Sequence, residues 1–212
     1  MHDSDLTGTF RSSLSPSRMP LALFGGSFNP PHIGHLAVAE ACADAAGLDR
    51  VLWMPAATAP HKQDDPTLAS ADARLAMVRL AIEGNPRFDV SDLEITRGGV
   101  SYTLETVRQL ADMHPGDELA LILGGDSLNY FPSWRNPRAI LELARLIVYR
   151  RPGSELADAP DWVLERTTVV EGIPLHLSST RIRQRIANGQ TVRYLIPDAV
   201  RQLVEETGLY RL

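Results

Sequence analysis

The chain has 212 residues, of which 44% are hydrophobic and 22% are charged, and its formal net charge at pH 7 is −5. A net acidic chain is a poor candidate for non-specific nucleic-acid binding, and no apolar run is long enough to cross a membrane. The single cysteine, Cys42, excludes an internal disulfide framework and suits the reducing cytoplasm, where we expect the protein to act.

Residues 1–18 are rich in Ser and Thr without a hydrophobic period, which predicts a disordered tail before one domain at 19–212. From residue 21 onward, short apolar runs alternate with helical patterns. This alternation predicts an α/β fold with a parallel sheet covered by helices on both faces. Strands are expected at 21–24, 51–54, 88–90, 119–123, 146–149, 168–170 and 175–177, and helices at 35–46, 71–83, 102–113, 137–144, 180–188 and 198–207.

Ligands of such sheets bind outside the carboxyl ends of the strands, which here directs attention to 25–35, 55–62 and 124–134. The first of these segments reads GGSFNPPHIGH. Two glycines after a strand permit a tight turn and close approach of a ligand. His32 and His35 are three residues apart, so they lie on one side of the first turn of the predicted helix.

Backbone N–H groups at a helix start favour an anion, and two imidazoles beside them can stabilise charge on a transferring phosphate. The segment therefore predicts a phosphate site. A histidine pair at this spacing is also half of a metal site, although the other histidines show no ligand spacing. Neither the Walker P-loop pattern nor the dinucleotide pattern GxGxxG occurs in the chain.

The string resembles the G-x-F-x-P-x-H-x-G-H signature of the nucleotidyltransferase superfamily, and class I aminoacyl-tRNA synthetases share its tetrapeptide HIGH. Near the C-terminus, residues 178–183 read SSTRIR and open a predicted helical part at about 178–212. Hydroxyl groups and Arg at a helix start can hold a triphosphate, although Ser and Thr are also common N-caps. Synthetases carry a Lys-rich loop there, whereas this chain has one lysine, Lys62.

Four further pieces resemble the bacterial nicotinate-nucleotide adenylyltransferases over about 20–212. They are APHK at 59–62, SYT at 101–103, GGDSL with FPSW at 124–134, and RRPG at 150–153. The resemblance implies a Rossmann-like doubly wound sheet and transfer of AMP from ATP to nicotinate mononucleotide. It also implies Mg²⁺ entering with ATP and is compatible with a homo-oligomer.

The resemblance further implies which residues form the site. The catalytic residues would be His32, His35 and Arg183. ATP would be bound by Gly25, Gly26, Ser27, Phe28, His32, His35, Gly125, Asp126, Ser179, Thr180 and Arg183. Nicotinate mononucleotide would be bound by Lys62, Tyr102, Thr103, Asp126, Trp134, Arg135 and Arg151. No metal ligand is expected from the protein itself.

Several of these residues have an alternative structural role. Lys62 can hold the phosphate of the mononucleotide or be a solvated surface cation. Trp134 can stack on a pyridine ring or belong to the core. Asp126 can accept from ribose hydroxyls or cap a helix at 127–130.

Three other functions remain open at this point. The first is adenylyl transfer to nicotinamide mononucleotide or phosphopantetheine. The second is a non-catalytic nucleotide sensor on the same fold, and the third is a metal-binding protein that uses the histidine pair.

Overall fold

The computed structural model describes residues 20–151 and 159–211. The tail predicted at 1–18 therefore lies outside the described residues. The strands are β1 (Pro20–Gly26), β2 (Arg50–Pro55), β3 (Phe88–Val90), β4 (Glu118–Gly124), β5 (Ala144–Arg150) and β6 (Thr167–Glu171). The helices are α1 (Ile33–Ala46), α2 (Ala71–Ile82), α3 (Leu93–Arg97), α4 (Thr103–Met113), α5 (Gly125–Tyr130), α6 (Pro137–Leu143), α7 (Asp161–Leu164), α8 (Ser179–Ala187) and α9 (Asp198–Thr207), with two 3-10 helices, η1 (Pro60–Lys62) and η2 (Phe131–Ser133).

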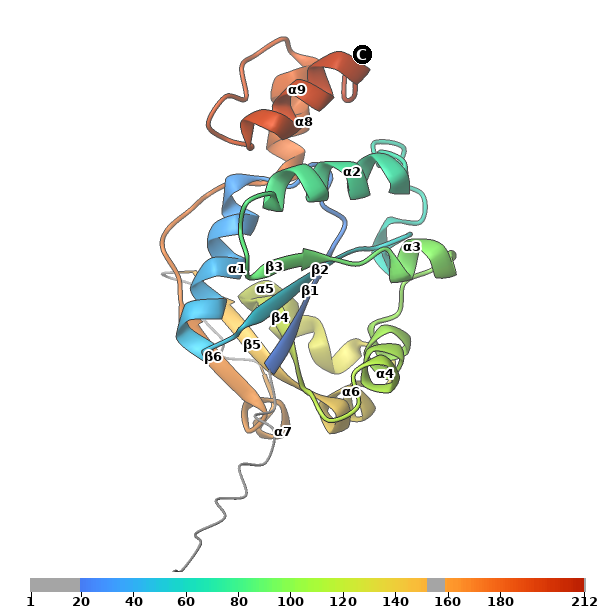
Figure 1. The fold of residues 1–212 in the computed structure, drawn as a ribbon, viewed down its shortest axis with the longest axis vertical. Helices are drawn as coiled ribbons and strands as arrows, with labels where there is room; N and C mark the ends of the chain where they lie inside the picture. Colours follow the sequence, from blue (N-terminus) through green and yellow to red (C-terminus); the bar gives the residue numbers. More distant parts are fainter. Residues whose placement is uncertain (1–19, 152–158, 212) are drawn as a thin grey trace, which may run out of the picture.

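In the described part of the chain the strands form one six-stranded sheet in the order β3-β2-β1-β4-β5-β6 (Figure 1). Every pair of neighbouring strands is parallel. This is the strand order of the Rossmann fold, with its switch point between β1 and β4. The predicted fold class is confirmed.

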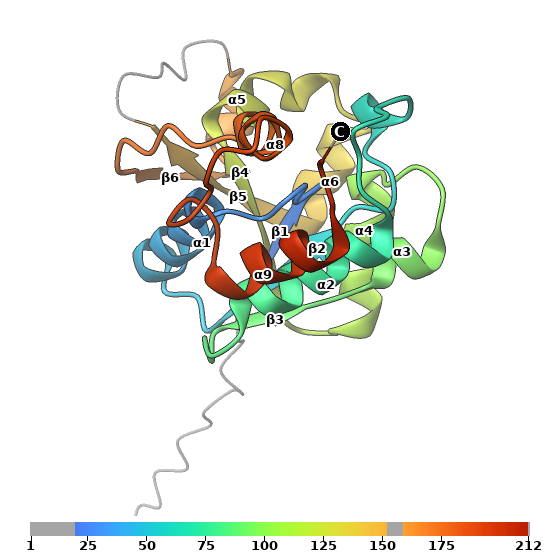
Figure 2. The same ribbon diagram turned by 90° about the horizontal axis from the view of Figure 1, so that it is seen from above.

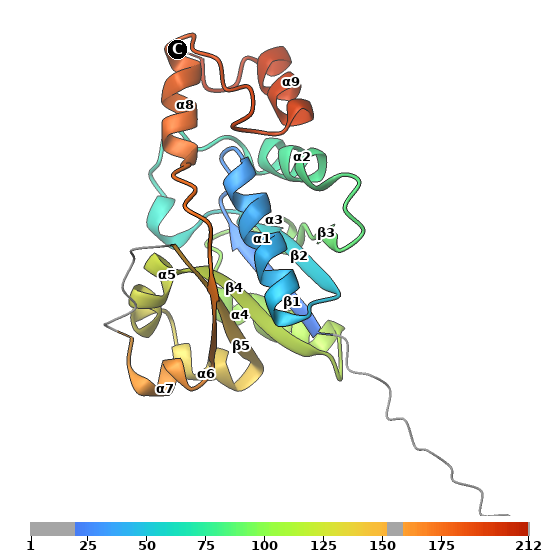
Figure 3. The same cartoon turned by 90° about the vertical axis from the view of Figure 1, so that its left-hand side faces the viewer.

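Alternate residues of each strand contribute to the two faces of the sheet. Ala22 and Phe24 of β1 belong to the core under α1, α2, α8 and α9. Leu21 and Leu23 belong to the core under α4, α5, α6 and α7. In Figure 3, α1 crosses the first of these faces and α8 stands above it. Because both faces are covered, the strands are apolar on both sides, as the sequence runs predicted.

The last helix, α9, packs on α2, and the residues after α9 contact the loop that follows β1. The pair α2 and α9 lie side by side in Figure 1 and Figure 2. Beyond α9, the hydroxyl of Tyr210 donates to Asn29 Oδ1 at 2.7 Å. The described chain therefore ends against the segment that carries the histidine motif.

Most predicted elements are present with boundaries shifted by one or two residues. The strand predicted at 175–177 is wrong, because residues 172–178 have no regular secondary structure. Leu175 and Leu177 instead line a cavity beside His32. The patterns also do not predict α3 and α7, whose five and four residues are too few to show a helical period.

Candidate active site

The two histidines at the start of α1 cap the helix and each other. The N–H of His35 donates to His32 Nδ1 at 3.3 Å, and the N–H of His32 donates to His35 Nδ1 at 3.1 Å. Their rings are stacked, with centroids 3.7 Å apart. Because each Nδ1 accepts a hydrogen bond, the proton of each neutral imidazole must sit on Nε2. Each ring therefore presents its N–H donor at the atom farthest from the helix backbone.

Burial keeps these imidazoles neutral at pH 7. Burial lowers the pKa of His32 to about 4, and the positive charge of Arg151 acts in the same direction. The pKa of His35 lies well below its usual value, chiefly because of burial, with smaller effects from the neighbouring His32 and from Lys62. Both rings can therefore donate to a phosphate oxygen without first taking up a proton.

Small and aromatic residues fix the position of the pair. A side chain at Gly34 would place its Cβ 3.0 Å from His32 Nδ1, so the glycine between the histidines leaves room for the ring. Phe28 is 2% exposed, and its ring lies edge-on to His35 with centroids 5.2 Å apart. The side chain of Phe28, predicted to contact ATP, is therefore part of the core that supports His35.

A cavity of about 280 Å³ opens beside the histidine pair. Its wall combines the start of α1, the end of η1, the end of β5 and the start of α8. No carboxylate belongs to its lining within the described residues, whereas three cations do. This charge favours an anionic ligand. The polar side chains of the lining include His32, His35, Lys62, Tyr149, Arg151 and Arg183.

The hydroxyl groups at the start of α8 have different partners. Ser178 is the N-cap, and its Oγ accepts from the N–H of Arg181 at 3.3 Å. Ser179 Oγ donates to the carbonyl of Pro30 at 2.8 Å, which joins α8 to the histidine segment. Thr180 is exposed and lines the cavity. The N-capping role thus falls on Ser178, and Ser179 and Thr180 both border the cavity, where they were predicted to hold phosphate.

Arg183 reaches from α8 to two loops. Its Nη1 donates to the carbonyl of Asn29 at 2.9 Å, and its Nη2 donates to Thr67 Oγ1 at 2.9 Å. Asn29 is 1% exposed and also donates through Nδ2 to the carbonyl of Thr67 at 2.9 Å. Arg183 is therefore held at the edge of the cavity by the loops that follow β1 and η1.

Lys62 lies at the end of η1, on the same cavity as the histidines. Partial burial lowers its pKa, and Arg183 acts in the same direction, whereas Asp65 opposes the shift. A cation held beside other cations is well placed to bind a phosphate that neutralises them. Lys62 therefore borders the same cavity as the histidines, and its role at the phosphate of the mononucleotide stays a prediction.

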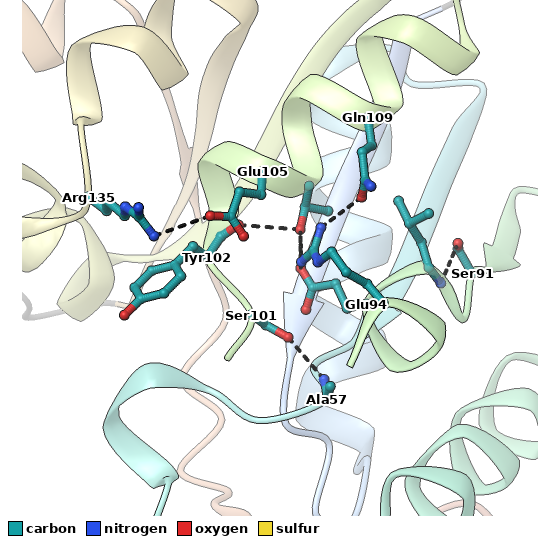
Figure 4. A network of polar contacts seen from close by, with 11 residues as sticks. Ala57, Ser91, Glu94, Ser101, Tyr102, Glu105, Gln109 and Arg135 are labelled. Atoms are coloured by element: carbon teal, nitrogen blue, oxygen red, sulfur yellow. Dashed lines mark hydrogen bonds and ion pairs between the residues drawn. The ribbon is translucent and has the colours of Figure 1, made fainter. Parts of the chain in front are cut away.

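Four other predicted residues do not line this cavity and lie at the start of α4 and just after η2. The guanidinium of Arg135 lies over the Tyr102 ring, 4.7 Å from its centroid, and its Nη1 donates to Glu105 Oε1 at 3.2 Å (Figure 4). Thr103 is the first residue of α4, and Tyr102, the N-cap, makes no side-chain capping bond. Trp134 is tilted against Phe131 with centroids 5.2 Å apart and is only partly buried.

A buried polar cluster positions this end of α4. Thr106 Oγ1 donates to Glu94 Oε1 at 2.5 Å and accepts from Arg97 Nη2 at 3.0 Å (Figure 4). Arg97 Nη1 donates to Gln109 Oε1 at 2.8 Å. Thr106 is completely buried and Glu94 is 7% exposed. The cluster joins α3 to the first turns of α4.

Ser101 holds the same end of α4 against the loop after β2. Its Oγ accepts from the N–H of Ala57 at 3.0 Å, and its own N–H donates to the carbonyl of Thr58 at 2.9 Å. The first residue of the SYT piece is thus structural. The second and third, Tyr102 and Thr103, remain partly accessible.

The other predicted residues lie at the ends of β1 and β4. Gly25 and Gly26 form the end of β1 itself, paired with Met54 and Pro55, so the chain turns after them rather than at them. Asp126 is exposed in the first turn of α5, whose N-cap is Gly124. Because no side chain caps α5, the capping alternative for Asp126 is wrong.

The last two residues predicted to bind ATP are Gly125 and Ser27. Gly125 begins α5. Ser27 follows β1, and its carbonyl accepts from Arg74 Nη1 at 3.1 Å. The cavity joins the predicted catalytic residues to Lys62 and Arg151, whereas the predicted mononucleotide-binding residues Tyr102, Thr103, Trp134 and Arg135 lie outside its lining.

The family model described as cytidylyltransferase-like matches residues 23–185. A probable nicotinate-nucleotide adenylyltransferase of Salinibacter ruber is 47% identical over 193 residues, which are 91% of this chain and 98% of that protein. This chain belongs to the nicotinate-nucleotide adenylyltransferase family. A probable nicotinate-nucleotide adenylyltransferase of Geobacillus thermodenitrificans is 43% identical over 190 residues, which are 90% of this chain and 85% of that protein.

A solved structure shares the fold of this family member at low identity. It is Plasmodium falciparum nicotinic acid mononucleotide adenylyltransferase complexed with NaAD, with a TM-score of 0.74 and 16% identity. The match covers 90% of this chain and 97% of that chain. Among the described residues of this adenylyltransferase-family chain, no helix is long and apolar enough to cross a membrane, and no group of three or more His, Cys, Asp or Glu side chains could hold a metal ion.

Two residues that were not among the predicted site residues also shape this adenylyltransferase-family site. Arg74 of α2 is 1% exposed and donates to the loops after β1 and β2. In the sequence, the sign of this role is that the charged Arg74 lies on the same helix face as the apolar Met77 and Val78, which are completely buried. Asn29 was visible within the motif, but its contacts with Thr67 and Tyr210 lie far away in sequence and had no local signal.

Proposed function

We propose that this chain transfers AMP from ATP to nicotinate mononucleotide, giving deamido-NAD and pyrophosphate. The observation that carries the proposal is the stacked pair His32 and His35, which lines one cavity together with Lys62 and Arg183. Membership of the nicotinate-nucleotide adenylyltransferase family supports the choice of substrates.

The reaction needs no general base. A phosphate oxygen of the mononucleotide, already ionised at pH 7, forms a bond to the α-phosphorus of ATP. The bond from that phosphorus to the oxygen bridging to the β-phosphorus breaks, and pyrophosphate leaves with the electron pair. Catalysis then reduces to positioning two anions in line and stabilising the charge that develops.

The described residues offer a part for each task. His32 and His35 would donate from Nε2 to the α-phosphate oxygens, where charge develops. Ser179, Thr180 and Arg183, at the start of α8, would hold the β- and γ-phosphates. Lys62, on the same cavity, would hold the attacking phosphate of the mononucleotide.

The start of α4 supplies a reason to prefer the nicotinate over the nicotinamide ring. Tyr102 makes no side-chain capping bond, so the first N–H groups of α4 suit a carboxylate at the positive end of the helix dipole. Thr103 adds a hydroxyl, and Trp134 offers a ring for stacking. The guanidinium of Arg135 packs over the face of the Tyr102 ring.

We also propose that Mg²⁺ enters with ATP, held by the substrate and not by side chains of the protein, and that its charge would offset that of the phosphates. Gly125 and Asp126, at the start of α5, would contact the nucleotide riboses, and Arg151 would add positive charge at the cavity. The reaction would take place in the cytoplasm.

The test is to incubate the protein with ATP and Mg²⁺, add each acceptor in turn and follow the release of pyrophosphate. The acceptors are nicotinate mononucleotide, nicotinamide mononucleotide and phosphopantetheine. We expect the highest kcat/KM with nicotinate mononucleotide. Absence of turnover with either pyridine mononucleotide would refute the proposal, and preference for phosphopantetheine would replace the acceptor.

A further inference from the structure

Arg74 is the most deeply buried charged side chain among the described residues, at 1% exposure. Within those residues no ion pair includes it. Burial lowers the pKa of its guanidinium, which is nevertheless charged at any ordinary pH. A buried charge without a carboxylate partner must be stabilised by dipoles.

Four carbonyl groups supply those dipoles. Arg74 Nη1 donates to Ser27 O at 3.1 Å and to Ala56 O at 2.6 Å, and Nη2 donates to Ala57 O at 2.8 Å. Nε donates to Ala69 O at 3.0 Å, just before α2. One planar guanidinium therefore contacts three separate segments of the backbone.

Two of these segments, at Ser27 and at Ala56, begin where the pairing of β1 with β2 ends. The pairing of β1 and β2 ends at Gly26 and Pro55, and one further bond joins the N–H of Ala56 to the carbonyl of Gly26 at 2.9 Å. Beyond that bond, the loop after β1 leads to His32, and the loop after β2 leads to Lys62. Arg74 joins the two loops through its side-chain hydrogen bonds just beyond the last backbone hydrogen bond between them.

The same contacts could not be made by an apolar residue or by lysine. An apolar side chain of similar volume would stabilise a core at least as well as a buried charge. An ammonium is a point charge with three donors and lacks the planar fork that reaches carbonyls on both sides. The chemistry of the site therefore favours a positioning role over general stabilisation.

We propose that Arg74 is a positioning residue, which sets the histidine loop and the Lys62 loop at the separation that in-line transfer between two bound phosphates requires. This inference rests on the proposed function. Arg74 does not line the cavity, so it acts through the two loops and not on the substrates themselves.

The first experiment measures the kinetics of Arg74→Lys. We expect kcat to fall about 100-fold, since a misplacement of about 1 Å has an effect of that size. The dissociation constants of ATP alone and of nicotinate mononucleotide alone should change less than about threefold, because each loop still binds its own ligand. Arg79→Lys is the matched control on the exposed side of the same helix and should keep the wild-type kcat.

A second readout does not depend on activity. Amide hydrogen exchange in the segments 26–30 and 55–63 should be faster in Arg74→Lys than in wild type, and unchanged in Arg79→Lys. Exchange in α4, which has no contact with Arg74 in the hydrogen bonds above, should be the same in all three proteins. If wild-type protein releases no pyrophosphate while exchange changes as expected, the proposed function fails and the link between the loops stands.

Three outcomes would overturn the inference. The first is a wild-type kcat in Arg74→Lys. The second is a loss of kcat matched by equal weakening of the separate binding of each substrate, or by unchanged exchange in both loops. The third is failure of both Arg74→Lys and the uncharged Arg74→Gln to fold, as judged by circular dichroism, since the residue would then be needed for folding and not for positioning.

Discussion

Replacing Thr106 with valine tests whether the buried cluster between α3 and α4 is as strong as its geometry indicates. Thr106→Val keeps the shape of the side chain but removes the hydroxyl that donates to Glu94 at 2.5 Å and accepts from Arg97 at 3.0 Å. Glu94 and Arg97 would keep their own contact at 3.9 Å, and Arg97 Nη1 would still donate to Gln109 Oε1. The buried Glu94 and the partly buried Arg97 would then each lack one hydrogen bond.

Each hydrogen bond to a charged group contributes about 1.5–3 kcal/mol. Because Glu94 and Arg97 still attract each other, we expect the two losses together to lower the free energy of unfolding by about 3 kcal/mol. For a chain of this size that corresponds to a decrease in Tm of about 6–12 °C. Thr106→Ser keeps the hydroxyl and should lower stability by only about 1 kcal/mol.

The assay is urea unfolding of the wild type and both variants, followed by circular dichroism at pH 7. The same proteins should show a rise in KM for nicotinate mononucleotide in Thr106→Val, with KM for ATP little changed, because the cluster positions the first turns of α4. A Thr106→Val variant within 0.5 kcal/mol of wild type would refute the reasoning, on the scale of a neutral surface substitution.

Four other changes probe the histidine motif and Lys62. We expect His35→Ala to lower kcat about 100-fold, as for loss of one donor to the transition state, and near-normal turnover would contradict its role. Lys62→Ala should raise KM for nicotinate mononucleotide far more than KM for ATP, and equal increases would contradict the assignment. Gly34→Ala places a Cβ 3.0 Å from His32 Nδ1 and should lower kcat about tenfold at unchanged fold, as judged by circular dichroism. Because burial lowers the pKa of His32 to about 4 from about 6.5 in the unfolded chain, unfolding by urea should become easier as pH falls from 6.5 to 4, and His32→Asn should make that dependence shallower.

The sequence predicted the parts of this protein that depend on local patterns. The apolar runs at the strands, the helix after His32 and the loops at the carboxyl ends of the strands all carry a signal within a few residues. The histidine pair could be placed on one side of a helical turn from its spacing alone. Those features are enough to predict the sheet, its two covered faces and the loop that carries the histidine pair.

The contacts that complete the site depend on residues far apart in sequence. The helical pattern at 71–83 places Arg74 on the face of the buried Met77 and Val78, but it does not predict the contacts of Arg74 with the loops after β1 and β2. The alternation of Leu175 and Leu177 predicts a strand at 175–177, but both residues line the cavity and the segment has no regular secondary structure. The partner of a buried polar group is set by tertiary packing, and no local period records it.

The contact between Tyr210 and Asn29 also sets a time order on synthesis. A ribosome adds about 5–20 residues per second, so roughly 10–40 s pass between the addition of these two residues, which are 181 positions apart. During that interval β1, α1 and β2 can form and pair. The loop at Asn29 still lacks Arg183 and the Tyr210 hydroxyl. A growing chain therefore carries a nearly complete sheet well before it has an assembled cavity, and the earliest-made motif is among the last to reach its final form.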